Sequence, residues 1–189
     1  MLKNNKLDNI CNGLHQGIIL EVEDFKTYSL EEIVPNINKD NPLIVMLDHL
    51  EDPHNFGAII RSCEAFGVDA IIIPNDRSVK ITSTVVKTSV GTIEKVPIIN
   101  VTNLNNDIKK LKNYGYWIIG TDMEGTDYTT IDYRTKVVII IGNEGRGIGR
   151  LVSENCDYIA KIPMKGTVNS LNASVAAGIF LAEIIKSRG

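Results

Sequence analysis

Polar and charged side chains that could bind or activate a substrate lie in three short stretches of this 189-residue chain. The first stretch holds Asn55 and Arg61, the second holds Glu144 in a glycine-rich loop, and the third holds Ser170 and Asn172. An arginine can bind a phosphate through two hydrogen bonds, and a carboxylate can accept hydrogen bonds from an arginine or a substrate. Each residue also has a purely structural interpretation, as a helix cap, a solvated helix residue or a backbone acceptor.

The glycine-rich loop Gly142-Asn-Glu-Gly-Arg-Gly-Ile-Gly149 directly follows an apolar run and so lies at the carboxyl end of a buried strand, where open α/β sheets bind ligands. Its spacing excludes a dinucleotide fingerprint and a phosphate loop, which need glycine at positions one, three and six, or lysine before Ser or Thr. Only 47 residues follow Gly142 (189 − 142), too few for an ordinary Rossmann-type methyltransferase. The alternative is that the glycines only form a tight turn and have no function. The carboxylate of Glu144 inside the loop makes this alternative less favoured.

The third stretch opens a C-terminal segment that otherwise has the apolar character of a helix. Asn and Ser lower helix propensity there, and the small residues Ala173, Ala176, Ala177 and Gly178 remove the bulk that normally fills a core. We therefore expect a ligand or another chain to approach this backbone closely.

Strand and helix patterns alternate from residue 42 to the end, which is typical of an α/β fold with a mainly parallel sheet and helices on both faces. The continuous apolar runs 43–47 and 137–141 predict strands buried on both sides. Further strands are expected over 68–73, 96–101, 116–119 and 158–162, and helices over 55–66, 81–89, 103–113, near Leu151 and at the C-terminus.

The first 41 residues are organised differently. Residues 17–23 predict a strand, and Ser29-Leu-Glu-Glu32 is a capping box that opens a short helix ended by Pro35. A polar linker follows over 36–41. We therefore divide the chain into a short N-terminal segment, residues 1–41, and a single α/β domain, residues 42–189.

Composition narrows the class of protein. The net charge of −3 and the pI near 5.6 give no overall positive field for a nucleic acid, although local basic residues could still form a face. These residues are Lys80, Lys87, Lys95, Arg146, Arg150, Lys161 and Lys165. The chain has neither a run of about 18 apolar residues nor a signal peptide, which predicts a cytoplasmic protein without a membrane partner.

The three cysteines, Cys11, Cys63 and Cys156, are widely spaced and show no paired motif, so they predict buried thiols and neither a disulfide nor a zinc site. The three histidines likewise lack metal-ligand spacing, and no acidic cluster indicates magnesium. We expect no metal.

Three segments together resemble, in order, spacing and residue type, the motifs of the SpoU family of RNA ribose 2′-O-methyltransferases, within the knotted SPOUT superfamily. They are Asn55-Phe-Gly-Ala-Ile-Ile-Arg61, Ile141 to Gly149 leading to Ile162-Pro-Met164, and Val168-Asn-Ser-Leu-Asn-Ala-Ser-Val-Ala176. The resemblance implies a deep C-terminal trefoil knot, S-adenosylmethionine as the cofactor, an RNA substrate and a homodimer. The knot comes from the resemblance alone.

The same resemblance implies roles for the polar residues. Arg61 matches the catalytic arginine, which would bind the adjacent phosphate and lower the pKa of the ribose 2′-hydroxyl. Asn55 matches a residue that arranges the active site, and Glu144 matches one that organises substrate and arginine, including across the dimer. Ser170 and Asn172 match polar catalytic residues of the third motif.

For the cofactor, the resemblance implies binding largely through backbone groups of the knotted loops. Gly142, Ile162 and Leu171 match those positions. Taken singly, Ile162 and Leu171 would be ordinary core residues.

The segment His15-Gln16-Gly17 resembles the junction before the catalytic domain in the branch that methylates guanosine in 23S, large-subunit ribosomal RNA. Those relatives carry a small RNA-binding domain before the junction, whereas fourteen residues precede His15 here, so residues 1–41 are expected to be a remnant of that domain or a linker from it. Two alternatives remain open, a transfer-RNA guanosine 2′-O-methyltransferase and a non-catalytic RNA-binding protein that retains the fold.

Overall fold

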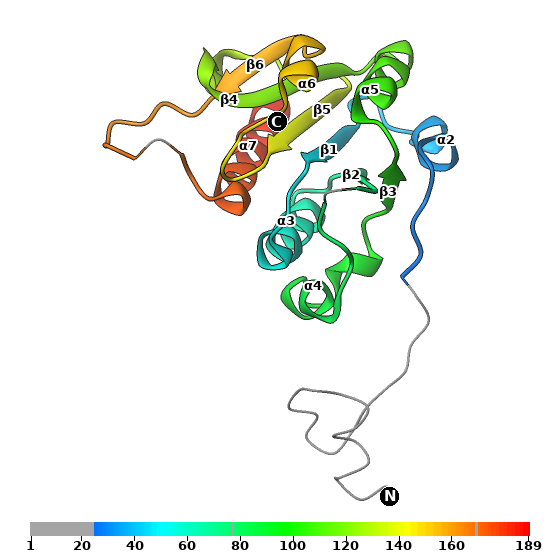
Figure 1. Ribbon diagram of the computed structural model, residues 1–189. Helices are drawn as coiled ribbons and strands as arrows, with labels where there is room; N and C mark the ends of the chain where they lie inside the picture. The colour runs from blue at the N-terminus through cyan, green and yellow to red at the C-terminus, as the bar shows by residue number, and fades with distance from the viewer. Residues whose placement is uncertain (1–24, 77, 169) are drawn as a thin grey trace, which may run out of the picture.

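A six-stranded, fully parallel sheet forms the centre of the computed structural model, which describes residues 25–76, 78–168 and 170–189 (Figure 1). The strand order across the sheet is β3-β2-β1-β5-β4-β6. The strands are β1 (Leu43–Asp48), β2 (Ala70–Pro74), β3 (Ile98–Val101), β4 (Trp117–Asp127), β5 (Val137–Gly142) and β6 (Tyr158–Lys161).

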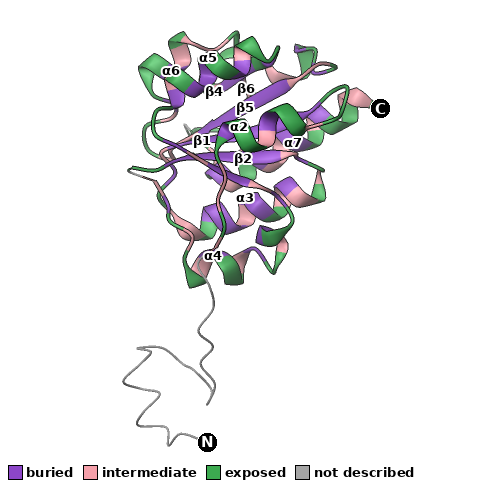
Figure 2. Cartoon of the chain, turned by 90° about the vertical axis from the view of Figure 1, so that its right-hand side faces the viewer, coloured by how far each residue is buried: buried purple, intermediate pink, exposed green. Residues whose placement is uncertain are grey.

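Helices cover both faces of this sheet (Figure 2). The buried side chains form one hydrophobic cluster on each side. One face packs against α3 (Pro53–Ala65), α4 (Ser83–Thr88) and α7 (Ala173–Arg188). The other packs against α2 (Leu30–Ile33), α5 (Leu104–Asn113) and α6 (Arg150–Glu154). Short 3₁₀ helices span Val34–Asn36, Thr92–Glu94 and Tyr128–Thr130. The predicted α/β class is confirmed.

Strand β1 shows why its continuous apolar sequence becomes a central strand. Leu43, Val45 and Leu47 belong to the cluster beneath α3 and α7, whereas Ile44 and Met46 belong to the cluster beneath α5. All five are essentially inaccessible to solvent. Because side chains alternate between the two faces of a strand, only a strand covered on both sides needs apolar residues at every position.

The sheet reverses its direction of growth between β1 and β5. From β1 the chain builds outward through β2 to β3, and β5 later pairs with the other side of β1, aligning Asp48 with Gly142. The loops after these two strands therefore begin side by side at the carboxyl edge of the sheet, the edge at which α/β sheets bind ligands.

Local structure differs from the predicted pattern in two places. Strand β4 was expected to end at Ile119 but runs to Asp127, because the polar residues after Ile119 pair with β6 across a bulge between Thr121 and Thr126. The capping box at Ser29 is present, but Pro35 does not end the helical segment, which continues as a 3₁₀ turn to Asn36. A proline near the start of a helical turn sacrifices no hydrogen bond.

The described part of the N-terminal segment is attached to the domain: Tyr28 forms a parallel bridge with Ile99 of β3. The predicted strand over residues 17–23 and the junction at His15 lie outside the described residues. The trefoil knot stays a prediction.

Cys63 is fully buried, as predicted, and burial raises the pKa of its thiol. Cys156 keeps partial exposure, and burial raises its thiol pKa to about 11. Cys11 lies outside the described residues. Among the residues that the structure describes, no helix is long and apolar enough to span a membrane. That same part of the chain contains no cluster of three potential metal ligands.

Val90 has a left-handed backbone, with φ of 53°, and two thirds of its side chain is exposed. A β-branched residue is strained there by roughly 1–2 kcal/mol, and glycine is not. Allowing for the greater freedom of glycine in the unfolded chain, Val90→Gly should raise the free energy of unfolding by about 0.5–1 kcal/mol. Val86→Gly in α4 should lower it by roughly 0.5–1 kcal/mol. Urea unfolding of both variants tests this, and equal losses would contradict it.

Candidate active site

The glycine-rich loop after β5 closes on itself through two backbone hydrogen bonds. The amide of Asn143 donates to the carbonyl of Gly147 over 3.0 Å, and the amide of Gly147 donates back over 2.9 Å. This closure brings Gly147 so near to Gly142 that a Cβ on Gly142 would lie 2.2 Å from the Gly147 carbonyl carbon. Gly147 itself has φ of 66°. Glycine is therefore needed at these two positions, because the backbone of Gly147 lies against Gly142 and has a positive φ.

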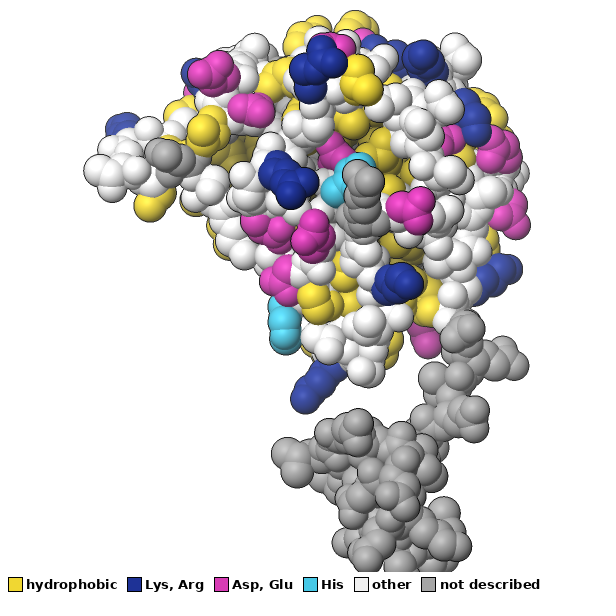
Figure 3. Space-filling model, viewed as in Figure 1, with side chains coloured by type: hydrophobic (Ala, Val, Ile, Leu, Met, Phe, Trp, Pro, Cys, Tyr) yellow, Lys and Arg dark blue, Asp and Glu magenta, His cyan; other side chains and the backbone are white. Residues whose placement is uncertain are grey.

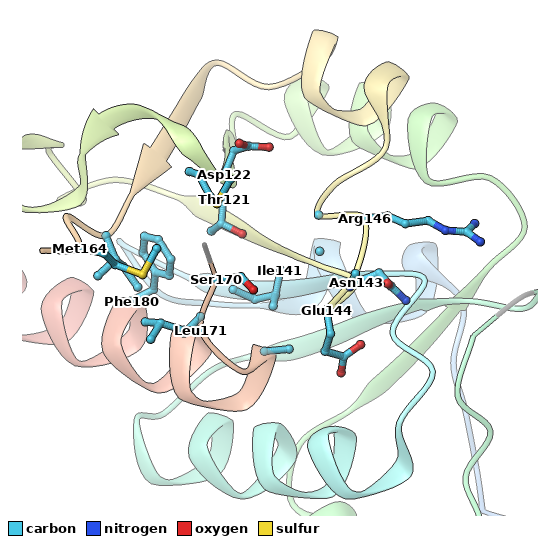
Figure 4. A pocket seen from close by; sticks show the side chains of 17 residues that line it. Thr121, Asp122, Ile141, Asn143, Glu144, Arg146, Met164, Ser170, Leu171 and Phe180 are labelled. Carbon is cyan, nitrogen blue, oxygen red and sulfur yellow. Dashed lines mark hydrogen bonds between the residues drawn. The ribbon is translucent and has the colours of Figure 1, made fainter. Parts of the chain in front are cut away.

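A cavity of about 330 Å³ opens beside this loop at the carboxyl edge of the sheet (Figure 4). Its walls come from the middle of β4, the end of β5 and the loop after it, the segment between β6 and α7, and the first half of α7. The lining residues are Thr121, Asp122, Met123, Ile141, Gly142, Asn143, Glu144, Gly145, Arg146, Gly147, Ile162, Met164, Ser170, Leu171, Ala173, Ala176 and Phe180.

The cavity has distinct apolar and polar sides. Met164, Leu171 and Phe180 lie together at one end, whereas Thr121 and Asp122 enter from β4 (Figure 4). An apolar wall with a few polar groups suits a small ligand that carries an aromatic base and hydrophilic substituents.

Asn55 joins the three stretches of polar residues through two hydrogen bonds. Its Nδ2 donates to Oε1 of Glu144 over 2.6 Å, and its Oδ1 accepts from Nδ2 of Asn172 over 2.9 Å. These contacts span 89 and 117 positions of the sequence. Asn55 is 7% exposed, so the loss of either partner would leave a buried amide group unsatisfied.

The two asparagines differ in their relation to helix ends. Asn172 is the N-cap of α7, because its Oδ1 accepts from the amides of Ser174 and Val175. Asn55 is not an N-cap, contrary to the structural interpretation of the sequence. Helix α3 begins earlier, at Pro53, and its cap is Asp52, whose side chain accepts from the amide of His54. Asn55 is therefore free to link Glu144 and Asn172.

Arg61 is not brought to the cavity within one chain. It is exposed, does not line the cavity, and forms no hydrogen bond or ion pair within the described residues. Gly57, one helical turn before it, packs against Thr88 of α4, and Glu64 pairs with Lys95 over 3.2 Å. Arg61 therefore lies on the side of α3 that faces the segment from Thr88 to Lys95.

On the face that Figure 3 shows, the basic side chains do not form a continuous patch. Lys and Arg side chains stand apart in the view of Figure 3, with acidic and uncharged side chains between them. Lys95 pairs with Glu64, and Arg150 pairs with Glu154 over 2.8 Å. Arg146 lies at the cavity and extends away from it (Figure 4).

Most of the predicted site residues meet at one place. Gly142, Glu144, Ile162, Ser170 and Leu171 line the cavity, and Asn55 and Asn172 adjoin it through Glu144. Their individual roles stay predictions.

Sequence reasoning missed the contribution of β4, namely Thr121, Asp122 and Met123, because this polar stretch has the character of a loop. Its position directly after a buried strand was the available signal. Phe180 was also missed, since it is buried like an ordinary core residue and packs edge-on against Tyr128.

The sequence of this chain matches a known protein family. Residues 42–182 match the SpoU rRNA Methylase family. The chain is 42% identical to YacO of Bacillus subtilis, which is assigned to the TrmH family of tRNA/rRNA methyltransferases, and 46% identical to a Staphylococcus epidermidis protein assigned to the same family. Each alignment covers 97% of this chain and 75% of the relative.

Solved structures agree with this match. The SpoU methyltransferase AviRb from Streptomyces viridochromogenes, in complex with AdoMet, has a TM-score of 0.79 at 28% identity, covering 86% of this chain and 66% of AviRb. An AdoMet-bound rRNA methyltransferase from Sinorhizobium meliloti has a TM-score of 0.79 at 30% identity, covering 85% and 61% of the two chains. A TrmH/SpoU tRNA modifying enzyme from A. aeolicus has a TM-score of 0.73 at 33% identity, covering 79% of this chain and 77% of that enzyme.

The chain therefore belongs to the SpoU family of RNA methyltransferases. It is an enzyme that uses S-adenosylmethionine. The cavity fits this cofactor: its apolar end suits an adenine, its polar side suits ribose and charged groups, and the absence of a Cβ on Gly142 keeps the loop tightly closed beside it.

Gly142→Ala should abolish cofactor binding, because the new methyl group would overlap the backbone of Gly147 and force the loop apart. The matched variant is Gly166→Ala, where a Cβ has no atom within 4 Å and no positive φ opposes it. Calorimetric titration with S-adenosylmethionine should show no binding for the first variant and unchanged binding for the second. Equal affinities for Gly142→Ala and the wild type would refute this account of the loop.

Asn55→Asp should lower the free energy of unfolding by about 1–3 kcal/mol, because it places a carboxylate against the carboxylate of Glu144. Adding Glu144→Gln should recover much of this loss, since the new amide can donate to Asp at position 55. Urea unfolding of both single variants and the double variant measures the coupling. Strictly additive effects would show that the Asn55–Glu144 contact is absent in solution.

Proposed function

We propose that this protein transfers a methyl group from S-adenosylmethionine to the 2′-hydroxyl of a guanosine in large-subunit ribosomal RNA, acting as a cytoplasmic homodimer. The observation that carries the proposal is the hydrogen-bonded junction of Glu144, Asn55 and Asn172 directly beside the cofactor cavity. The domain assignment is part of it, with residues 42–189 as the catalytic domain and residues 1–41 as a remnant of an RNA-binding domain or a linker from it.

S-adenosylmethionine, when bound, supplies a methyl group on a positively charged sulfur atom. Gly142, Ile162 and Leu171 would hold it, with backbone groups as the polar contacts and their side of the cavity as the apolar wall. The walls exclude water from the reacting groups and orient them, which is the main contribution that a site can make to a displacement between two bound reactants.

The junction of polar side chains then holds Glu144 in place. One hydrogen bond joins Asn55 to Glu144, and a second joins Asn172 to Asn55, so the Glu144 carboxylate is held at the edge of the cavity and is ready to accept a hydrogen bond from substrate. Ser170 is exposed at the same edge and can contact the substrate. These residues position the ribose rather than react with it.

Arg61 is assigned to the ribose phosphate and to the developing negative charge on the 2′-oxygen. A guanidinium is almost never neutral, so it is a poor proton acceptor but a strong electrostatic partner for an oxyanion. A phosphate oxygen or water is left to accept the proton.

A second copy of the chain completes the site in this proposal. Arg61 and the cavity lie apart in one chain, so dimerisation would have to supply the missing contact. Helix α7 offers a surface for it: Val175 is 51% and Ile185 36% exposed, and a Cβ on Gly178 would meet no atom within 4 Å. Such an open apolar side suits a self-complementary partner.

The choice of ribosomal RNA rests on the sequence of the junction at His15, and the choice of guanosine on the family resemblance. The name of the Bacillus subtilis relative gives both tRNA and rRNA, and one of the similar structures is of a tRNA modifying enzyme. Mapping 2′-O-methyl sites in RNA from cells with and without the protein tests the target. Loss of a site in transfer RNA, with ribosomal RNA unchanged, would overturn the ribosomal assignment.

Arg61→Ala should reduce methyl transfer from labelled S-adenosylmethionine to RNA by at least about a hundredfold, the scale expected for the loss of a group that stabilises a developing oxyanion. Cofactor affinity should not change, since Arg61 is assigned to the ribose phosphate and the 2′-oxygen and not to the cofactor. Arg134→Ala is the control, because Asp132 is the one ion-pair partner of this exposed arginine among the described residues. Full activity of Arg61→Ala would refute the role given to this residue.

A further inference from the structure

Asp48 is a buried carboxylate at the carboxyl end of the central strand β1, and it does not line the cavity. Its side chain is 3% exposed. One oxygen accepts a hydrogen bond from the amide of Gly149 over 2.6 Å, and the other contacts Nδ1 of His49. Burial of a carboxylate costs free energy unless hydrogen-bond partners satisfy it, so Asp48 depends on these two contacts.

His49, the next residue, holds the opposite end of the same loop through its backbone. Its carbonyl accepts a hydrogen bond from Nδ2 of Asn143 over 3.0 Å, and its own backbone has φ of 57°, which is uncommon outside glycine. Asp48 and His49 thus contact the β5–α6 loop at its first residue, Asn143, and at its last glycine, Gly149.

We infer that Asp48 and His49 form a positioning pair, which holds the glycine-rich loop in the shape that binds the cofactor. Four of the seven residues from 143 to 149 are Gly or Asn, so the unrestrained loop would populate many conformations. Fixing both ends in the free protein removes part of the ordering cost from the binding step, which raises affinity. The pair acts through the loop and touches neither reactant.

The inference rests on the proposed use of this cavity and adds residues to which no catalytic or binding role has been given. A positioning role for Asp48 can be distinguished from a purely stabilising role by measuring cofactor affinity beside the melting temperature. A purely stabilising residue would change the melting temperature and leave the affinity of the folded protein for S-adenosylmethionine unchanged. A positioning residue must change that affinity.

The test is calorimetric titration with S-adenosylmethionine. Asp48→Ala should weaken binding at least about tenfold, because the amide of Gly149 loses its partner. Asp48→Asn keeps one acceptor oxygen and should recover most of the affinity. The control is Asp107→Ala, another buried carboxylate, which lies on α5 and pairs with Lys110. It should lower the melting temperature without changing cofactor affinity.

His49→Gly keeps the backbone carbonyl, tolerates the positive φ and removes only the imidazole contact with Asp48. It should weaken cofactor binding about two- to fivefold. Because glycine relieves the strain of the positive φ, which offsets the lost contact, the variant should still fold, so the test holds even if Asp48→Ala does not. Hydrogen exchange at amides 143–149 should quicken in both Asp48→Ala and His49→Gly.

Wild-type cofactor affinity in Asp48→Ala, or an equal loss in Asp107→Ala, would overturn the inference. So would wild-type affinity in His49→Gly if Asp48→Ala does not fold. Failure of the wild-type protein to bind S-adenosylmethionine is a different result, which would overturn the proposed use of the cavity.

Discussion

The side chain of Asn55 is the contact on which the candidate site depends. It donates to Glu144 and accepts from Asn172, so one amide holds together the helix after β1, the loop after β5 and the start of α7. Because Asn55 is buried, the donor and the acceptor of its side chain must both find partners within the protein. This requirement places α7 relative to the glycine-rich loop and thereby shapes the cavity between them.

The parallel sheet makes that contact possible. Strands β1 and β5 are neighbours with Asp48 opposite Gly142, so the loops that follow them start side by side at the carboxyl edge. Gly142 and Gly147 let the second loop close tightly, and Asp48 and His49 contact both of its ends. A strand buried on both faces therefore supports the glycine-rich loop.

Local patterns predicted well those features that depend on near neighbours. The apolar runs of β1 and β5, the capping box at Ser29 and the cap of α7 at Asn172 all follow from short-range rules. The prediction was wrong at Ile119, where polar residues continue strand β4, because pairing with β6 compensates for low strand propensity. The alternative interpretation of Asn55 as a helix cap was wrong as well, since Asp52 caps the helix and Pro53 begins it.

The sequence by itself determined the class of the protein, because its three motifs keep their residue types and spacing whatever their place in space. It also identified Glu144, Asn55 and Asn172 as polar residues in unusual surroundings. Only the tertiary structure decided that these three share one hydrogen-bonded junction, that β4 completes the cavity and that Arg61 stands outside it. Those facts depend on strand order and on contacts between residues about a hundred positions apart, which no local pattern encodes.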